Sequence, residues 1–138
     1  MYIENTDIEN IRADVNVLDE IMLKHDLIRA GQWDYERVTY DKKYVVKEGT
    51  YYLRVFGVAT EGDVDMRDAI IQLKKPVIGK YYYPFGVEYG EEEHFPASLL
   101  KDCAATLKAV NADLKPYNLK VATEVQEAKK DKKPALTK

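Results

Sequence analysis

The sequence contains little cysteine and little histidine, and this limits the chemistry it can carry. A single cysteine, Cys103, occurs in 138 residues, which excludes an internal disulfide and a zinc site built from several cysteines. The two histidines, His25 and His94, are far apart in the chain. We therefore expect no metal site, and a reducing compartment, which we take to be the cytoplasm.

Long apolar runs and an excess of positive charge are also missing. No run approaches the roughly 18 to 20 apolar residues that span a bilayer, and the first ten residues do not resemble a secretory signal. The formal net charge is -3, which argues against binding to a phosphate backbone. We expect a cytoplasmic protein that binds neither membranes nor nucleic acids.

Catalytic and cofactor motifs are absent as well. The chain contains no phosphate-binding loop, no dinucleotide fingerprint, no nucleophile elbow and no paired-histidine zinc motif. The acidic residues Glu61, Asp63 and Asp65 do not match the order of a calcium-binding EF-hand loop. We identify no catalytic residue and expect no cofactor.

The charge is unevenly distributed and suggests a boundary near the C-terminus. Residues 120–138 contain six lysines and three acidic residues and have no aromatic residue, whereas residues 1–119 carry a charge of -6. Such a segment buries too little apolar surface to offset the entropy of ordering. The sequence predicts one domain over residues 1–119, followed by a basic tail over 120–138 that is a frayed helix or disordered.

Helical spacing dominates both ends of the predicted domain. Thr6 and Glu9 form a capping-box pattern, and apolar residues then recur every three or four positions, which predicts a helix from about Asp7 to Lys24. Near the C-terminus, Pro96 is typical of a helix start, and a second apolar stripe, which includes Cys103, predicts a helix that ends before Pro116.

Between these helices the apolar pattern changes to the alternation of β-strands. We expect strands at about Leu27–Tyr40, Lys43–Val46, Tyr51–Thr60, Ala69–Lys75 and Lys80–Phe85, the first of them interrupted near Gly31. We also expect a hairpin turn at Lys47–Thr50 and a loop after Phe85. The connections are too short for helical crossovers, so the sheet must be antiparallel and mostly a meander. The predicted fold is α+β, with the N-terminal and C-terminal helices packed on one face of the sheet.

The strand over Tyr51–Thr60 has large apolar residues on both faces. Alternation places Tyr51, Leu53 and Val55 on one face, and Tyr52, Arg54, Phe56 and Val58 on the other. Two helices can cover one face, whereas the second face needs a curved sheet, the C-terminal segment or another subunit to cover it. We therefore expect a homodimer, because exposed aromatic patches often mark interfaces.

Tyrosine is abundant, and one segment stands out among the aromatic residues. Nine of the eleven tyrosines lie between Tyr35 and Tyr89, where packing of the sheet explains most of them. The only tryptophan, Trp33, precedes Asp34 and Tyr35. In one interpretation Trp33 forms the wall of a ligand pocket, with Asp34 or Arg54 as its polar anchor. In the structural interpretation, which we favour, Trp33 fills the core and Arg54 pairs with a carboxylate on the neighbouring strand.

Three segments together resemble a known family. They are LDEIMLKHDLIRAGQWDY, YYLRVFGVATEGDVD and IIQLKKPVIGKYYY, and they cover about half of the chain. The sequence is similar to the YugN-like proteins, small cytoplasmic proteins of Bacillus-type bacteria. The family's characteristic positions correspond to Trp33, Asp34, Tyr35, Leu53, Arg54, Gly62 and Asp65, although a second family glycine is missing around Gly31. The resemblance implies a fold and a cytoplasmic location, and no reaction.

Three functional hypotheses follow. The leading one is a non-catalytic protein that binds a small ligand or another protein and acts as a homodimer, with Trp33, Asp34, Tyr35 and Arg54 as candidate ligand-binding residues. The alternative is an enzyme with a carboxylate and tyrosine site built from Asp34, Tyr35 and Arg54, which requires these side chains to converge in one pocket. A third is an adaptor that captures a partner through its basic tail.

Overall fold

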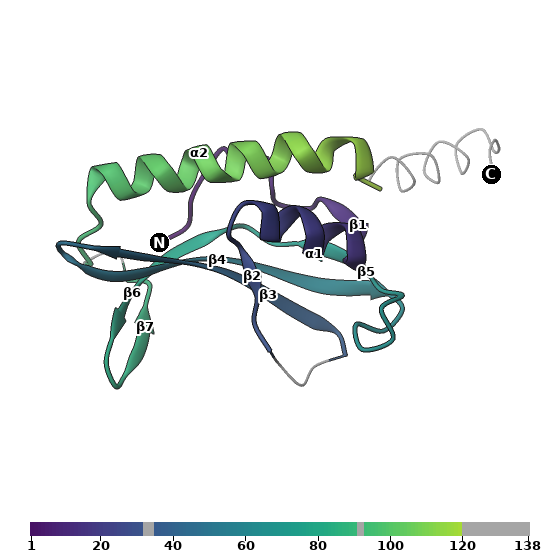
Figure 1. The fold of residues 1–138 in the computed structure, drawn as a ribbon, viewed down its shortest axis with the longest axis horizontal. Helices are drawn as coiled ribbons and strands as arrows, with labels where there is room; N and C mark the ends of the chain where they lie inside the picture. The colour runs from purple at the N-terminus through teal and green to yellow at the C-terminus, as the bar shows by residue number, and fades with distance from the viewer. Residues whose placement is uncertain (32–34, 91–92, 120–138) are drawn as a thin grey trace.

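One antiparallel sheet and two helices make up the part of the chain that the structure describes. The computed structural model describes residues 1–31, 35–90 and 93–119 (Figure 1). The elements are β1 (Arg12–Asp14), α1 (Val15–Lys24), β2 (Ile28–Arg29), β3 (Arg37–Val46), β4 (Gly49–Glu61), β5 (Ile70–Leu73), β6 (Val77–Tyr82), β7 (Gly86–Glu88), α2 (Ala97–Leu114) and a short 3-10 helix (Lys115–Tyr117). The predicted tail over 120–138 lies outside the described residues.

Strand β4 lies at the centre of the sheet. One of its edges pairs with β3 along almost its whole length, and the other edge is shared by β5 and β6. These two strands lie end to end, separated by residues 74–76, and β1 pairs with the outer edge of β5. Because β2, β3, β4 and β5 are neighbours in chain order, the predicted meander is confirmed for most of the sheet.

Both helices lie on the same side of the sheet (Figure 1), which confirms the predicted α+β arrangement. Residues of β4 that point toward the helices, Tyr51, Leu53 and Val55, are fully buried. They join a single core with the apolar faces of the helices, which is formed on α1 by Val15, Leu18 and Met22 and on α2 by Leu99, Cys103, Leu107, Val110 and Leu114. As predicted, α2 ends before Pro116.

The first helix begins later than the sequence pattern predicts. Asn5, Asp7 and Asn10 have φ of 60°, 61° and 75°, in the left-handed region that asparagine and aspartate tolerate better than most residues but that a right-handed helix excludes. The predicted capping box of Thr6 and Glu9 is therefore wrong. The side chain of Asp14 caps α1 instead, by accepting a hydrogen bond of 2.8 Å from the backbone N–H of Asn16.

Two strand assignments are also corrected. Residues 43–46 do not form a separate strand, because β3 pairs with β4 without interruption from Arg37 opposite Val58 to Val46 opposite Gly49. The segment expected as a loop after Phe85 begins with β7, which pairs with β6. The predicted hairpin turn at Lys47–Thr50 is confirmed, and its residues 47 and 48 form the turn itself.

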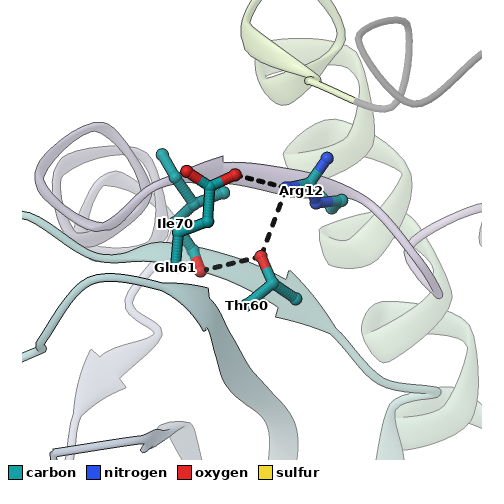
Figure 2. A network of polar contacts seen from close by, with 4 residues as sticks. All are labelled: Arg12, Thr60, Glu61 and Ile70. Atoms are coloured by element: carbon teal, nitrogen blue, oxygen red, sulfur yellow. Dashed lines mark hydrogen bonds and ion pairs between the residues drawn. The ribbon is translucent and has the colours of Figure 1, made fainter. Parts of the chain in front are cut away.

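A side-chain network attaches β1 to the end of β4 (Figure 2). The Arg12 guanidinium donates to the hydroxyl of Thr60 at 3.3 Å and to the carboxylate of Glu61 at 3.2 Å, and the Thr60 hydroxyl donates to the carbonyl of Ile70. The backbone of Arg12 also bonds the segment after α2, through Asn118 and Leu119. This corner of the molecule therefore joins three distant parts of the chain.

A polar contact holds the two helices together and should make stability depend on pH. Asp113 of α2 lies 2.7 Å from Nε2 of His25 and 3.2 Å from Nζ of Lys24, and the hydrogen bonds to His25 and Lys24 lower the pKa of the Asp113 carboxyl. A lowered pKa means that folding favours the charged carboxylate. This contribution is present above the ordinary pKa of 3.8 and is lost as the pH falls through the folded-state value.

We therefore expect Asp113→Asn to lower the free energy of unfolding at pH 5 to 7, with a smaller difference from the parent chain below about pH 4. Urea denaturation at several pH values measures this difference. The control is Glu48→Gln, which neutralises an exposed carboxylate in the β3–β4 turn. A difference that stays the same from pH 7 to pH 3 contradicts the assignment.

Candidate binding face

The side of the sheet opposite the helices is only partly covered. In Figure 1 the β6–β7 hairpin projects from this side, away from α1 and α2. Strand β4 presents Tyr52, Arg54, Phe56 and Val58 here, all of them less buried than Tyr51, Leu53 and Val55. We call this surface of β4, together with the adjoining parts of β6 and the β6–β7 hairpin, the open face. The predicted strand with apolar residues on both faces is thus confirmed.

Arg54 lies at the centre of the polar contacts on the open face. Its Nε donates to Oδ1 of Asp41 at 2.9 Å, and its Nη1 lies 2.6 Å from the hydroxyl oxygen of Tyr89. Asp41 is directly opposite Arg54 in the pairing of β3 with β4, so the ion pair is the cross-strand pair of the structural interpretation. Burial by itself lowers the pKa of Arg54, but the bonds to Tyr89 and Asp41 outweigh it and raise the pKa overall.

Aromatic rings surround this ion pair. The Arg54 guanidinium lies 5.4 Å from the ring centre of Tyr52, and the Tyr52 ring meets that of Tyr81 edge to face at 6.1 Å. Gly79 of β6 permits the close approach of the hairpin, because a Cβ atom there would lie 2.7 Å from the ring of Tyr89. This close packing places the ring of Tyr89 against β6, where its hydroxyl lies within hydrogen-bond distance of Arg54.

An apolar hollow adjoins the ion pair. It has a volume of about 390 Å³, and its lining residues are Met1, Tyr2, Phe56, Val77, Tyr89 and Gly90. A second hollow of about 560 Å³ shares Tyr2, Phe56 and Val77 and extends toward Lys74 and Lys75. Phe56 therefore borders both spaces, and the open face combines an apolar depression with a fixed, charged neighbour.

The described candidate residues from the sequence do not meet in one place. Trp33 and Asp34 lie outside the described residues. Tyr35 is exposed, and its backbone carbonyl accepts a hydrogen bond from the N–H of Val64. Arg54 is opposite Asp41, which lies four residue steps beyond Arg37 along β3, and four steps of an extended strand span about 13 Å. Tyr35 and Arg54 therefore do not form a common site.

Sequence reasoning did not identify Asp41, Phe56 or Tyr89 as site residues. A signal for Asp41 was present, since pairing counted outward from the predicted β3–β4 turn places Asp41 opposite Arg54. For Tyr89 we find no such signal, because its position depends on β7 and on Gly79.

The buried cysteine is a further group that could carry chemistry. Cys103 is fully buried in the core, and burial raises the pKa of its thiol to about 11, so the thiol stays protonated at neutral pH. Within the described residues no group of histidine, cysteine and carboxylate side chains is arranged to hold a metal ion. Over the same ranges, no helix has the length and apolar character needed to cross a membrane.

Comparisons with known proteins point to one family. The sequence profile of the YugN-like family matches residues 4–131. The uncharacterized protein YlbA of Bacillus subtilis is 54% identical over 110 residues, and the match covers 75% of this chain and 92% of YlbA. The crystal structure of the uncharacterized conserved protein YugN from Geobacillus kaustophilus has a TM-score of 0.74 at 53% identity, covering 84% of this chain and 96% of that one.

Proposed function

Because this chain belongs to the YugN-like family, and the two relatives compared above are described as uncharacterized, we propose a function from the geometry: a non-catalytic homodimer that binds through its open face. The observation that carries this proposal is the exposed aromatic surface around Phe56. Cores normally bury such side chains, and a contiguous exposed apolar patch typically marks an interface or a ligand site.

The exposed aromatic area is large enough to matter for association. Tyr2 is 61% exposed, Phe56 36%, Tyr83 82% and Phe85 83%. A whole aromatic side chain has a surface of about 150 to 250 Å², so these fractions leave roughly 500 Å² of aromatic surface exposed. Each partner contributes about 800 Å² to a standard interface, and the exposed aromatic surface is a large part of that area.

The shape of the open face favours a second copy of this chain as the partner. A twofold interface needs a surface that is complementary to itself. The open face has a projecting part, the hairpin turn with Tyr83 and Phe85, and a receding part, the hollow lined by Tyr2, Phe56 and Val77. In Figure 1 the hairpin projects on the side of the sheet that lacks helices, so it is directed toward an approaching copy.

A small apolar ligand is the second candidate, since the 390 Å³ hollow has the volume of a small-molecule site. We place the protein in the cytoplasm, because its single cysteine cannot form an internal disulfide, as suits a reducing compartment. The separation of Tyr35 from Arg54 and the protonated, buried thiol of Cys103 support the non-catalytic part of this proposal.

Light scattering and native mass spectrometry test the dimer. We expect the purified chain, of 15.9 kDa, to show twice this mass at micromolar concentration, and Phe56→Glu to show the single mass, because a buried unpaired carboxylate costs several kcal/mol. The matched control is Leu23→Glu, which adds the same charge at an exposed apolar residue of α1. It should remain a dimer.

Circular dichroism must show that Phe56→Glu is folded. A single mass for the unmodified chain, or an equal loss of the dimer in both variants, contradicts the proposal. A mass of 15.9 kDa plus a small molecule would favour the ligand-binding candidate.

A further inference from the structure

A third hollow lies near the β4–β5 loop and is lined by three arginines. Its volume is about 280 Å³, and its lining residues are Arg29, Ala30, Gly31, Arg37, Val38, Val64, Asp65 and Arg67. They come from the segment at the end of β2, from the start of β3, and from the loop between β4 and β5. In Figure 1 these segments lie away from the β6–β7 hairpin, so this hollow is distinct from that of the open face.

Backbone hydrogen bonds fix the walls of this hollow. The N–H of Ala30 donates to the carbonyl of Thr39 at 2.8 Å, which holds the end of β2 against β3. The N–H of Val64 donates to the carbonyl of Tyr35 at 3.0 Å, and the N–H of Arg67 donates to the carbonyl of Val64 at 3.1 Å. The β4–β5 loop is therefore attached to the start of β3, and the hollow is defined before any ligand enters.

The charged groups that line the hollow are mainly positive. Three arginines and one acidic residue, Asp65, line the hollow, which gives the described lining a formal charge of +2 although the whole chain carries -3. Arg29 also forms an ion pair, since its Nε lies 3.3 Å from Oδ1 of Asp19. The same oxygen of Asp19 accepts a hydrogen bond from the hydroxyl of Tyr40. The ion pair uses one of the five guanidinium donors and leaves the terminal nitrogens for other contacts.

Arg67 has a backbone conformation that is unusual for a residue other than glycine. Its φ is 58°, in the left-handed region where residues other than glycine are uncommon, and such strained positions concentrate at functional sites. Within the described residues its guanidinium has no hydrogen bond or ion pair, while its backbone carbonyl accepts one from Asn16. The loop therefore presents a long cationic side chain at the hollow from a fixed backbone.

We propose that this hollow binds a phosphate group. Arginine forms paired hydrogen bonds with the oxygens of phosphate, and Val38 and Val64 provide low-dielectric walls that strengthen them. The 280 Å³ volume lies just below the about 300 Å³ at which sites for drug-sized molecules begin, so the ligand is inorganic phosphate or a small phosphomonoester. The site is independent of the proposed dimer.

Isothermal titration calorimetry at constant ionic strength tests the proposal, with inorganic phosphate and glycerol phosphate as probes and chloride as the reference. The variant is Arg67→Gln, because Arg67 is exposed and its side chain supports no described contact. The matched control is Lys101→Gln, which removes one positive charge from an exposed position on α2. We expect Arg67→Gln to weaken phosphate binding at least tenfold and Lys101→Gln to leave it unchanged.

Each result of the calorimetry either supports or overturns the proposed phosphate site. Tighter binding of glycerol phosphate identifies a phosphomonoester as the ligand, and tighter binding of inorganic phosphate identifies the free ion; both support the site. No phosphate heat beyond the chloride reference, or equal weakening in the two variants, overturns it. Equal urea denaturation midpoints of the parent and both variants confirm that folding is unaffected.

Discussion

Replacing Gly62 by alanine should lower the free energy of unfolding by about 2 to 4 kcal/mol. Gly62 follows β4 with a φ of 74°, which costs other residues about 1 to 2 kcal/mol. A Cβ atom there would also lie 2.4 Å from the backbone carbonyl oxygen of Asp68. Because the obstacle is backbone and not the end of a flexible side chain, the loop itself has to move.

Urea denaturation of Gly62→Ala measures this cost. Gly31→Ala is the matched control, because nothing lies within 4 Å of a Cβ atom at Gly31. We expect the control to change stability by less than about 0.5 kcal/mol, as exposed substitutions usually do. A loss of similar size in both variants would show that the backbone conformation at Gly62 is not restrictive. Since Arg67 belongs to the same loop, Gly62→Ala should also weaken phosphate binding.

Replacing Tyr40 by alanine should cost about 3 to 5 kcal/mol, the usual range for removing a large buried ring. Tyr40 is fully buried beneath α1, and its hydroxyl donates to Asp19 at 2.6 Å. Burial, together with the hydrogen bond to Asp19, raises the pKa of Tyr40, so its hydroxyl remains a donor at neutral pH. The side chain thus contributes both packing and a charge-assisted bond.

A second substitution separates these two contributions. Tyr40→Phe keeps the ring and removes the bond to Asp19, and should cost about 1.5 to 3 kcal/mol. Thermal and urea denaturation of both variants give the two values, with Tyr117→Ala as the control at a tyrosine that is 52% exposed. If Tyr40→Phe were as stable as the parent chain, the hydrogen bond to Asp19 would contribute nothing net to stability.

The parts of the fold that depend on local patterns were predictable from the sequence. The β3–β4 hairpin follows from alternating apolar residues and a turn signal, and α2 follows from a regular stripe bounded by prolines. The burial of Tyr51, Leu53 and Val55 follows from the same alternation. These features need only the spacing of residues along the chain.

The N-terminal region shows where such patterns fail. Ile8 and Ile11 continue the spacing of the helix, and both are buried as the pattern requires. They reach the core from turns, since Asn10 donates to the carbonyl of Leu73 and the N–H of Leu73 donates to Ile11. A bond between residues so far apart in sequence overrides the local preference, and spacing alone cannot distinguish the two solutions.

The binding face was predictable only in part. The outward direction of Arg54 and Phe56 follows from strand alternation. The position of Asp41 opposite Arg54 follows from counting residues outward from the β3–β4 turn. The hollow beside Phe56 depends on how Tyr2 and Tyr89 approach Val77 from two distant segments. The arginine hollow likewise combines a loop after β4 with the start of β3. Tertiary packing creates both sites, and no local motif encodes them.

The pairing of β1 with β5 has a consequence for the order in which the molecule forms during synthesis. Ala13 lies opposite Ile71, so β1 leaves the ribosome long before its partner strand exists. The hairpin of β3 and β4 closes over a short loop and can form early, whereas contacts of large sequence separation form slowly. The first strand to be made is therefore among the last to be placed, and the buried positions of Ile8 and Ile11 are complete only once β5 is available.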